Sequence, residues 1–137
     1  MTEQARESLL LVVTADKDTA ASMAELLRLR PDVRVLIAKS GYEGLQLLSA
    51  QNVDVVVVED PLPSMTGPEF VDRVHFKGHG ARCIMLTANP EAAAVQRAQQ
   101  RGRVKCVVAK PLQHDDVMLA VDFVTHMGPE QPAPENA

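Results

Sequence analysis

Length, composition and charge exclude several classes of protein. The chain has 137 residues, of which 46% are hydrophobic, 23% charged and only 3% aromatic, so it has room for one domain with an aliphatic core. The formal net charge of −4 argues against a role in coating nucleic acids, which requires a surplus of Lys and Arg. No apolar run approaches the length of a membrane span, and we expect a cytoplasmic protein without membrane partners.

The cysteines and histidines form no recognisable metal pattern. Cys83 and Cys106 stand apart rather than in a C-x-x-C pair, and we interpret both as small buried hydrophobic residues. His75 and His79 have a helical spacing, but a helix that ends near Gly78 would not hold the pair rigidly. These residues therefore predict no metal site.

Short aliphatic runs alternate with segments of helical periodicity along the chain. The runs lie at about 9–13, 33–38, 53–58, 82–86 and 104–109. The first, third and fifth runs are almost unbroken in apolar residues, as expected for parallel strands that helices cover on both faces. The fold class is therefore α/β, and this repeat favours a doubly wound, flavodoxin-like (βα)5 sandwich with a parallel sheet in the order 2-1-3-4-5.

The segments between the strands carry signals for helix starts. A hydroxyl residue followed three positions later by Glu is typical of a capping box, in which both side chains satisfy free backbone N–H groups. Asn before Pro likewise suits a cap and a first helical residue. These signals are Ser40 with Glu43, Thr66 with Glu69, and Asn89 with Pro90. They mark the expected starts of the second, third and fourth helices.

A change in composition follows the last predicted helix. Its apolar residues recur at helical spacing behind two acids that suit a helix N-terminus. They are Val117, Ala120, Val121 and Val124, behind Asp115 and Asp116. After Met127 the sequence has three prolines and no apolar periodicity. We therefore expect an N-terminal extension over 1–8, one domain over 9–127, and a disordered tail or linker over 128–137.

Polar residues stand at the ends of three predicted strands. Glu59 and Asp60 end the third strand, Thr87 ends the fourth, and Lys110 follows the fifth. In the predicted order the carboxyl ends of the strands meet at one edge of the sheet, and strands one and three are neighbours there. A carboxylate, a hydroxyl and an ammonium group therefore converge on the predicted site.

These residues resemble the receiver domains of bacterial two-component response regulators. The resemblance covers about residues 9–127 and rests on an acid before a P-x-M-x-G turn that ends at Gly67, Thr-Ala at Thr87, and Lys-Pro at Lys110. It implies that the acid ending strand three accepts a phosphoryl group, that two acids after strand one hold Mg²⁺, and that the Thr and Lys contact the phosphoryl group. Such groups suit phosphoryl transfer, which depends on positioning and charge neutralisation.

The sequence departs from the pattern of this family at several positions. Glu59 stands where an Asp accepts the phosphoryl group, and Thr14 and Ala15 stand where two acids hold the metal. Val107 replaces an aromatic residue that moves with activation, and a stiff β-branched side chain cannot report the state of the pocket in the same way. We therefore expect no catalysis, and weak or absent Mg²⁺ binding.

Other residues near the predicted pocket have alternative roles. Asp16 and Asp60 each lie one position from an acid of the family, so they either rescue the metal site or serve locally, Asp16 as a helix cap and Asp60 as a solvated loop residue. Lys110 is expected to pair with Glu59, and the resemblance implies a cis peptide at Lys110–Pro111. Glu59 then either imitates a phosphorylated side chain near Thr87 and Lys110 or only preserves a salt bridge.

The leading hypothesis is a phosphorylation-independent receiver, or pseudo-receiver, that binds a protein partner and is not an enzyme. The alternative is a conventional receiver in which a histidine kinase phosphorylates Asp60 or Glu59, with Asp16 helping to bind Mg²⁺. A third hypothesis places a nucleotide or flavin in the crevice, but no glycine-rich loop follows strand one.

The family often binds partners or dimerises through its fourth helix, fifth strand and fifth helix. In this chain the region carries four basic residues, Arg97, Arg101, Arg103 and Lys105. We interpret this cluster as the candidate partner face, suited to an acidic protein surface, and a homodimer through the same elements is a second expectation. No nucleic-acid partner is predicted for the domain.

Overall fold

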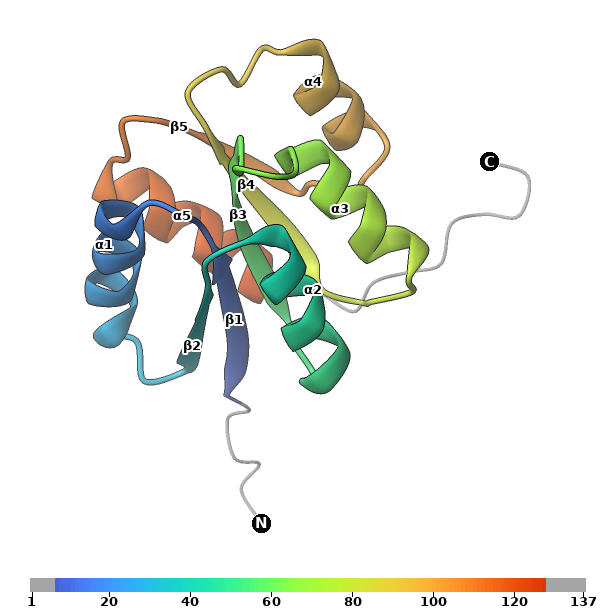
Figure 1. The fold of residues 1–137 in the computed structure, drawn as a ribbon. Helices are drawn as coiled ribbons and strands as arrows, with labels where there is room; N and C mark the ends of the chain where they lie inside the picture. Colours follow the sequence, from blue (N-terminus) through green and yellow to red (C-terminus); the bar gives the residue numbers. More distant parts are fainter. Residues whose placement is uncertain (1–6, 128–137) are drawn as a thin grey trace.

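Strands and helices alternate along residues 7–127, the part of the chain that the computed structural model describes (Figure 1). The strands are β1 (Ser8–Val13), β2 (Val33–Ala38), β3 (Val55–Asp60), β4 (Arg82–Thr87) and β5 (Cys106–Ala109). The helices are α1 (Lys17–Arg28), α2 (Gly41–Ala50), α3 (Gly67–Phe76), α4 (Ala93–Gln100) and α5 (His114–Thr125). Within this part, no helix is both long and apolar enough to cross a membrane.

The strands form one parallel sheet in the order β2-β1-β3-β4-β5, which confirms the predicted topology. β1, β3 and β4 lie inside the sheet, and their aliphatic runs are buried along most of their length. Such runs are stable there because the crossover helices cover both faces of the sheet. The carboxyl ends of all the strands consequently lie along one edge.

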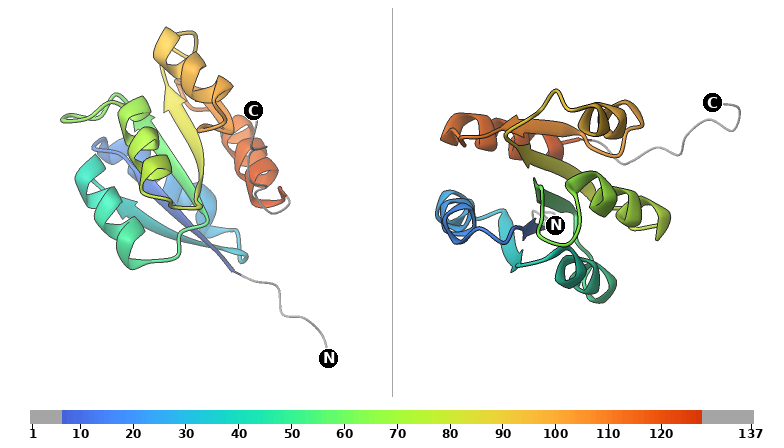
Figure 2. Two further views of the ribbon diagram at one scale, coloured as in Figure 1. Left: turned by 90° about the vertical axis from the view of Figure 1, so that its right-hand side faces the viewer. Right: turned by 45° about the horizontal axis from the view of Figure 1, so that its top comes forward.

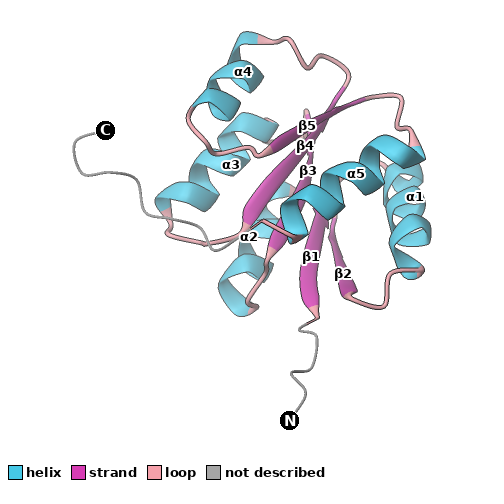
Figure 3. Cartoon of the chain, turned by 180° about the vertical axis from the view of Figure 1, so that it is seen from behind, coloured by secondary structure: helices cyan, strands magenta, loops and turns pink. Residues whose placement is uncertain are grey.

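Helices cover the two faces of the sheet unequally. One apolar cluster packs α2, α3 and α4 against the first face, and a second packs α1 and α5 against the other (Figures 2 and 3). Alternate residues of β3 divide between the clusters, since Val56 and Val58 belong to the first and Val57 to the second. By this alternation Glu59 and Asp60 leave the strand toward opposite faces of the sheet.

The predicted caps are confirmed for two helices and wrong for a third. Ser40 and Thr66 are the N-caps of α2 and α3, and their side chains accept hydrogen bonds from the backbone N–H three residues on. α4 instead begins at Ala93 after Ala92, without a side-chain cap. Asn89 and Pro90 form a preceding turn, in which the carbonyl of Asn89 accepts from the N–H of Ala92 at 3.1 Å.

Strand limits also differ from the prediction. β1 begins at Ser8 and β3 at Val55, and β3 continues to Asp60. β5 begins at Cys106 rather than 104 and only Val108 in it is buried, because β5 lies at the edge of the sheet. The predicted tail at 128–137 lies outside the described residues.

Cys83 is buried as expected, whereas Cys106 is only partly buried. Cys83 is buried in the cluster under α2, α3 and α4, and its burial raises the pKa of its thiol to about 12. Cys106 is half-buried at the edge strand, and burial raises its pKa as well. Both thiols are free.

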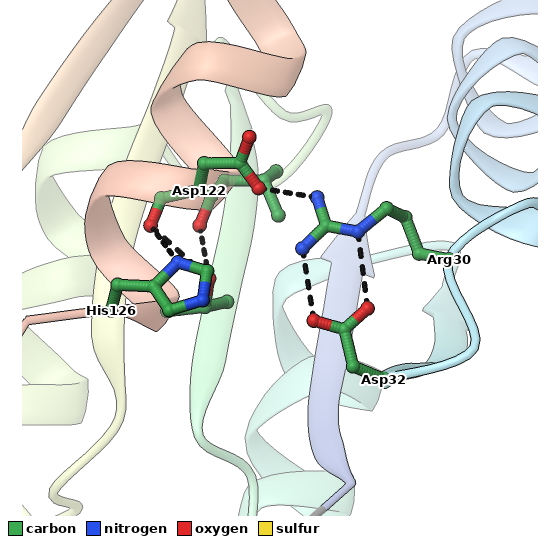
Figure 4. Close-up of polar contacts among 6 residues, drawn as sticks. Arg30, Asp32, Asp122 and His126 are labelled. Carbon is green, nitrogen blue, oxygen red and sulfur yellow. Dashed lines mark hydrogen bonds and ion pairs between the residues drawn. The ribbon is translucent and has the colours of Figure 1, made fainter. Parts of the chain in front are cut away.

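An ion-pair network ties the loop between α1 and β2 to α5 (Figure 4). Arg30 makes a two-pronged contact with Asp32, at 3.1 and 3.0 Å, and a third contact with Asp122 of α5 at 2.6 Å. The ring of His126 lies 2.9 Å from the backbone carbonyl of Asp122. The hydrogen bonds that Arg30 donates to Asp32 lower the pKa of Asp32 and raise the pKa of Arg30.

Candidate switch site at the carboxyl ends of the strands

The site lies where β1, β3 and β5 end at the same edge of the sheet. An open pocket of about 550 Å³ occupies this edge. Its lining comprises Ala15, Asp16, Glu59, Asp60, Pro61, Leu62, Pro63, Ala88 and Lys110. Residues from four separated parts of the sequence therefore meet here, as the sequence predicted.

Glu59 is the centre of a closed polar network. It is only 6% exposed. The Thr14 hydroxyl donates to its Oε1 and the Lys110 ammonium group to its Oε2. The predicted pair of Lys110 and Glu59 is thus confirmed, and both carboxylate oxygens have a donor within the protein. A buried carboxylate with two such donors is compensated for the loss of water.

Thr14 has a role that the sequence did not indicate. In the sequence Thr14 marks only the loss of a metal-binding acid, but its side chain is buried and joins β1 to β3 through Glu59. The same oxygen accepts a hydrogen bond from the N–H of Asp16 at 3.0 Å. The register of β1 against β3 explains this contact. Val12 pairs with Val57, so Thr14 and Glu59, each two residues further along its strand, project to the same face of the sheet.

Asp60 faces the opposite side of the sheet and is engaged with α3. Its Oδ1 accepts from the N–H of Gly67 at 2.7 Å, so the expectation of a solvated loop residue is wrong. The contact is close, since a Cβ on Gly67 would lie 2.7 Å from the Asp60 Cβ. The carboxylate thus holds the first residue of α3, where negative charge is favourable.

Asp16 is the N-cap of α1, one of its two expected roles. Its side chain accepts hydrogen bonds from the Thr19 hydroxyl at 2.6 Å and the Asp18 N–H at 3.3 Å. The Thr19 hydrogen bond is the main reason that the pKa of Asp16 is lowered, with the Asp18 bond second. The carboxylate that lies next to the positions of the family's metal acids is therefore committed to the start of a helix.

Two residues that the sequence assigned to the pocket, Thr87 at the end of β4 and Val107 within β5, do not line it. The Thr87 hydroxyl is buried and accepts from the N–H of Asn89 at 3.0 Å, so it serves the β4–α4 loop. Val107 is half-buried on β5 and packs against the cluster under α2, α3 and α4. The Lys110–Pro111 peptide is cis as expected, and Asp60–Pro61 is also cis.

Within residues 7–127, no group of three or more His, Cys, Asp or Glu side chains is placed to hold a metal ion. The pocket itself contains the carboxylates of Asp16, Glu59 and Asp60. Each of these accepts a hydrogen bond from another residue of the protein.

The predicted basic cluster divides into two parts. Arg97 is exposed on α4. Arg101, Arg103 and Lys105 instead border a groove beside the end of α3. Arg103 is not an exposed docking residue, because its guanidinium pairs with Asp72 at 2.6 Å and its side chain is only 15% exposed.

Two apolar side chains on α5 were missed. Leu119 and Phe123 are 68% and 59% exposed. They lie one turn apart, off the buried stripe of the helix, and this offset from the apolar period was a signal in the sequence. We use the name α4–α5 face for these two exposed side chains of α5 and the exposed Arg97 of α4.

Comparison with known proteins decides the family. The response regulator receiver domain family matches residues 10–122. The chain belongs to this family. It is therefore a receiver domain, a signalling module of two-component systems, as the motifs at the strand ends indicated.

Curated relatives support this assignment at modest identity. The chain is 31% identical over 102 residues to the response regulator receiver protein Anae109_2439 of Anaeromyxobacter sp. strain Fw109-5, covering 74% of this chain and 42% of that protein. It is 35% identical over 103 residues to the transcriptional regulatory protein AfsQ1 of Streptomyces coelicolor, covering 75% and 45%. The chain thus spans less than half the length of these relatives.

Solved structures show the same fold. The signal receiver domain of an HD domain-containing protein from Pseudomonas fluorescens Pf-5 superposes with a TM-score of 0.82 at 25% identity, covering 90% of both chains. A CheY-like receiver domain from Methanospirillum hungatei JF-1 gives 0.77 at 21% identity, covering 85% of this chain and 92% of the other. The fold is therefore closely similar although most of the aligned residues differ.

Proposed function

We propose that this receiver domain signals without being phosphorylated, as a pseudo-receiver that binds a protein partner through its surface and catalyses no reaction. The observation that carries the proposal is the state of Glu59, whose two carboxylate oxygens are taken by Thr14 and Lys110. The charge of Glu59 is thereby compensated by residues of the protein itself.

The positions of the other acids support the same proposal. Mg²⁺ prefers carboxylate oxygens that can reach it while it keeps several waters. Thr14 and Ala15 supply no carboxylate, Asp16 caps α1, and Asp60 holds the start of α3. A site for Mg²⁺ would have to break a helix cap, so we propose that metal binding is weak or absent.

The conventional function is the second candidate, and one observation favours it. Lys110 remains at the pocket, and Asp60 is only partly buried beside it. A phosphoryl group on Asp60 or Glu59 would have the Lys110 ammonium group within the same pocket. Phosphorylation of Asp60 at Oδ1 would, however, cost the hydrogen bond from the N–H of Gly67.

We place the partner on the α4–α5 face. Leu119 and Phe123 are large apolar side chains in solvent, and exposed aromatic and aliphatic anchors are common at protein interfaces. A second copy of the chain would bury the same side chains, so a homodimer through this face is the competing occupant.

A partner-capture experiment tests whether binding depends on the α4–α5 face or on the pocket at Glu59. We would immobilise the full chain, capture proteins from a lysate of the organism that encodes it, and quantify each captured protein by mass spectrometry. Leu119→Glu with Phe123→Glu should lower capture of the main partner by about tenfold, because interface anchors carry most of the binding energy. Glu59→Gln should leave capture unchanged.

Leu29→Glu is the control, because Leu29 is also a large exposed apolar residue and lies at the C-cap of α1, away from α5. Its capture should equal that of the parent chain. Loss of capture in Glu59→Gln, with the α5 variants unaffected, would contradict the proposal. Size-exclusion chromatography of the same variants reports whether the face holds a second copy.

A further inference from the structure

Two concave surfaces meet at the edge of the sheet opposite Glu59. The first, of about 710 Å³, lies at the amino ends of β1, β3 and β4 and reaches Met127 beyond the end of α5. The second, of about 730 Å³, lies between the end of α3 and the loop that joins α4 to β5. Both surfaces are lined by Gly78, His79, Gly80 and Arg82. They therefore form one groove that begins at Met127.

The described chain ends at the wall of this groove. The Arg82 guanidinium donates to the carbonyl of Met127 at 3.1 Å and to that of Val124 at 3.4 Å. The N–H of Met127 also donates to the carbonyl of Val124 at 3.3 Å. These bonds hold the end of α5 against the start of β4, so residues 128–137 are attached to the chain at the groove itself.

Charge does not select the occupant of the groove, because its cations already have partners. Arg82 is engaged by the end of α5, Arg103 pairs with Asp72 at 2.6 Å, and Lys105 has an interaction partner as well. Arg101 is the C-cap of α4, where the negative end of the helix dipole lies. The occupant must therefore be identified by hydrogen bonding and by the path of the chain.

His79 has an unsatisfied polar atom in the shared wall. Its Nε2 atom is buried and has no hydrogen-bond partner within residues 7–127. Buried polar atoms are nearly always paired, so this nitrogen is a position that a group in the groove would satisfy. The glycines on either side leave space for another segment, since no atom lies within 4 Å of a Cβ placed on Gly78 or Gly80.

The composition of residues 128–137 suits a segment that lies extended in a groove. Three of these residues are proline, at positions 129, 132 and 134. Proline restricts the backbone toward the polyproline II conformation, so less conformational freedom is lost when such a segment binds. Glu130 is the first of these residues whose side chain can accept a hydrogen bond, and three residues of extended chain span roughly 10 Å from Met127.

We propose that residues 128–137 bind in this groove, with the Glu130 carboxylate accepting a hydrogen bond from His79 Nε2. The covalent link favours this segment over one from another protein, because it gives an effective concentration on the order of millimolar. The bound segment would cover the amino ends of β1, β3 and β4 and set the direction in which the chain leaves the domain. This differs from the disordered tail or linker that composition alone predicts.

The site lies apart from the α4–α5 face and does not depend on the state of the pocket at Glu59. Its occupation is therefore tested without any partner or phosphodonor.

Backbone 15N relaxation of the full chain measures whether the segment is bound. The order parameters of Glu130 and Gln131 should exceed about 0.6, the value below which a backbone is flexible. Glu130→Ala should lower the order parameter of Gln131 below this value and shift the amide signal of His79. Glu135→Ala is the matched control, since it removes the same carboxylate from the same segment, and it should leave both readouts unchanged.

His79→Ala should release the segment as Glu130→Ala does, and the double variant should show no further effect. Melting temperatures equal to that of the parent chain would exclude unfolding as the cause. Order parameters below about 0.6 for Glu130 and Gln131 in the parent chain would overturn the proposal.

Two further outcomes would also overturn the proposal. Equal effects of Glu130→Ala and Glu135→Ala would mean that only the net charge of the segment matters. A shift of the His79 amide signal on about tenfold dilution of the protein would mean that the segment binds a second copy of the chain.

Discussion

One methylene group separates Glu59 from the Asp that the receiver family places at this position. The longer side chain leaves β3 on the α1–α5 side of the sheet and reaches the Thr14 hydroxyl, which follows β1. On its other side it meets Lys110, which follows β5. The substitutions at 14 and 59 are therefore complementary, because a hydroxyl now donates to the carboxylate where the family has acids that bind a metal.

Lys110→Ala should destabilise the protein. Glu59 is buried, so removing Lys110 leaves a carboxylate with one donor lost, and we expect a decrease of about 1–3 kcal/mol in the free energy of unfolding. Urea denaturation of Lys110→Ala, Glu59→Gln and the double variant measures the coupling. Additive effects of the two changes would mean that the pair contributes nothing.

Mg²⁺ should not bind the pocket in the low-millimolar range. Thr14 and Ala15 supply no anionic ligand, and the nearest alternative, Asp16, is bonded to Thr19 and the N–H of Asp18. An NMR titration should show no saturable shift of the Glu59 amide. The triple variant Thr14→Asp, Ala15→Asp, Glu59→Asp should regain such a shift, and a saturable response of the parent chain would contradict the account.

At this scale the sequence predicted the pair of Glu59 and Lys110 but not the bond from Thr14 to Glu59. The pair followed from opposite charges at adjacent strand ends. The Thr14 bond depends on the register of β1 against β3, which sets the face to which each side chain points. The exposure of Arg103 was predicted wrongly for a similar reason. It lies in the loop after α4, and its partner Asp72 comes from α3.

At the scale of single elements, the start of α3 is fixed from both sides. Thr66 caps the helix, its hydroxyl also donates to the Glu69 carboxylate, and Asp60 accepts from the N–H of Gly67. Residue spacing alone predicted the Thr66 cap, because a capping box is local. The start of α4 was predicted wrongly because Asn89 and Pro90 belong to a separate turn that precedes the helix. A cap pattern does not indicate how long the loop before a helix is.

Gly67→Ala should destabilise the domain although Ala favours helix. The new Cβ would lie 2.7 Å from the Asp60 Cβ and 3.1 Å from the Met85 Cε, so strand or helix must shift, at a cost of about 1–3 kcal/mol. Gly80→Ala is the control, because nothing lies within 4 Å of its Cβ. Thermal melts should show a lower Tm for the first variant only. Equal Tm values would show that the contact relaxes freely.

Over the whole molecule, the order of the strands and the covering of both sheet faces by helices were predictable from the sequence. The spacing of the aliphatic residues and the right-handed crossover connections determine both. Links between distant elements were not. The contact of Arg30 with Asp122 joins residues 92 positions apart, and no local pattern announces it. The α4–α5 face and the groove at the opposite edge are likewise properties of the assembled fold.

The Arg30 network should make a small contribution that disappears in acid. The pKa of Asp32 is lowered in the folded state, so its stabilisation is present above the ordinary value of 3.8 and is lost as pH falls through the lower, folded value. Asp32 is 40% exposed, so Asp32→Asn should cost under about 1 kcal/mol at neutral pH. Urea denaturation at pH 7 and pH 3 checks this, and a difference that grows in acid would contradict it.

The most direct test of the central proposal is intact-mass measurement of the full chain after incubation with acetyl phosphate and Mg²⁺. The parent chain should gain no phosphoryl group, because Glu59 is engaged with Thr14 and Lys110 and the carboxylates of Asp16 and Asp60 are committed to helix starts. The triple variant with restored Asp residues is the positive control for the assay. A stoichiometric phosphoryl adduct on the parent chain, mapped to Glu59 or Asp60, would contradict the proposal and establish a conventional receiver.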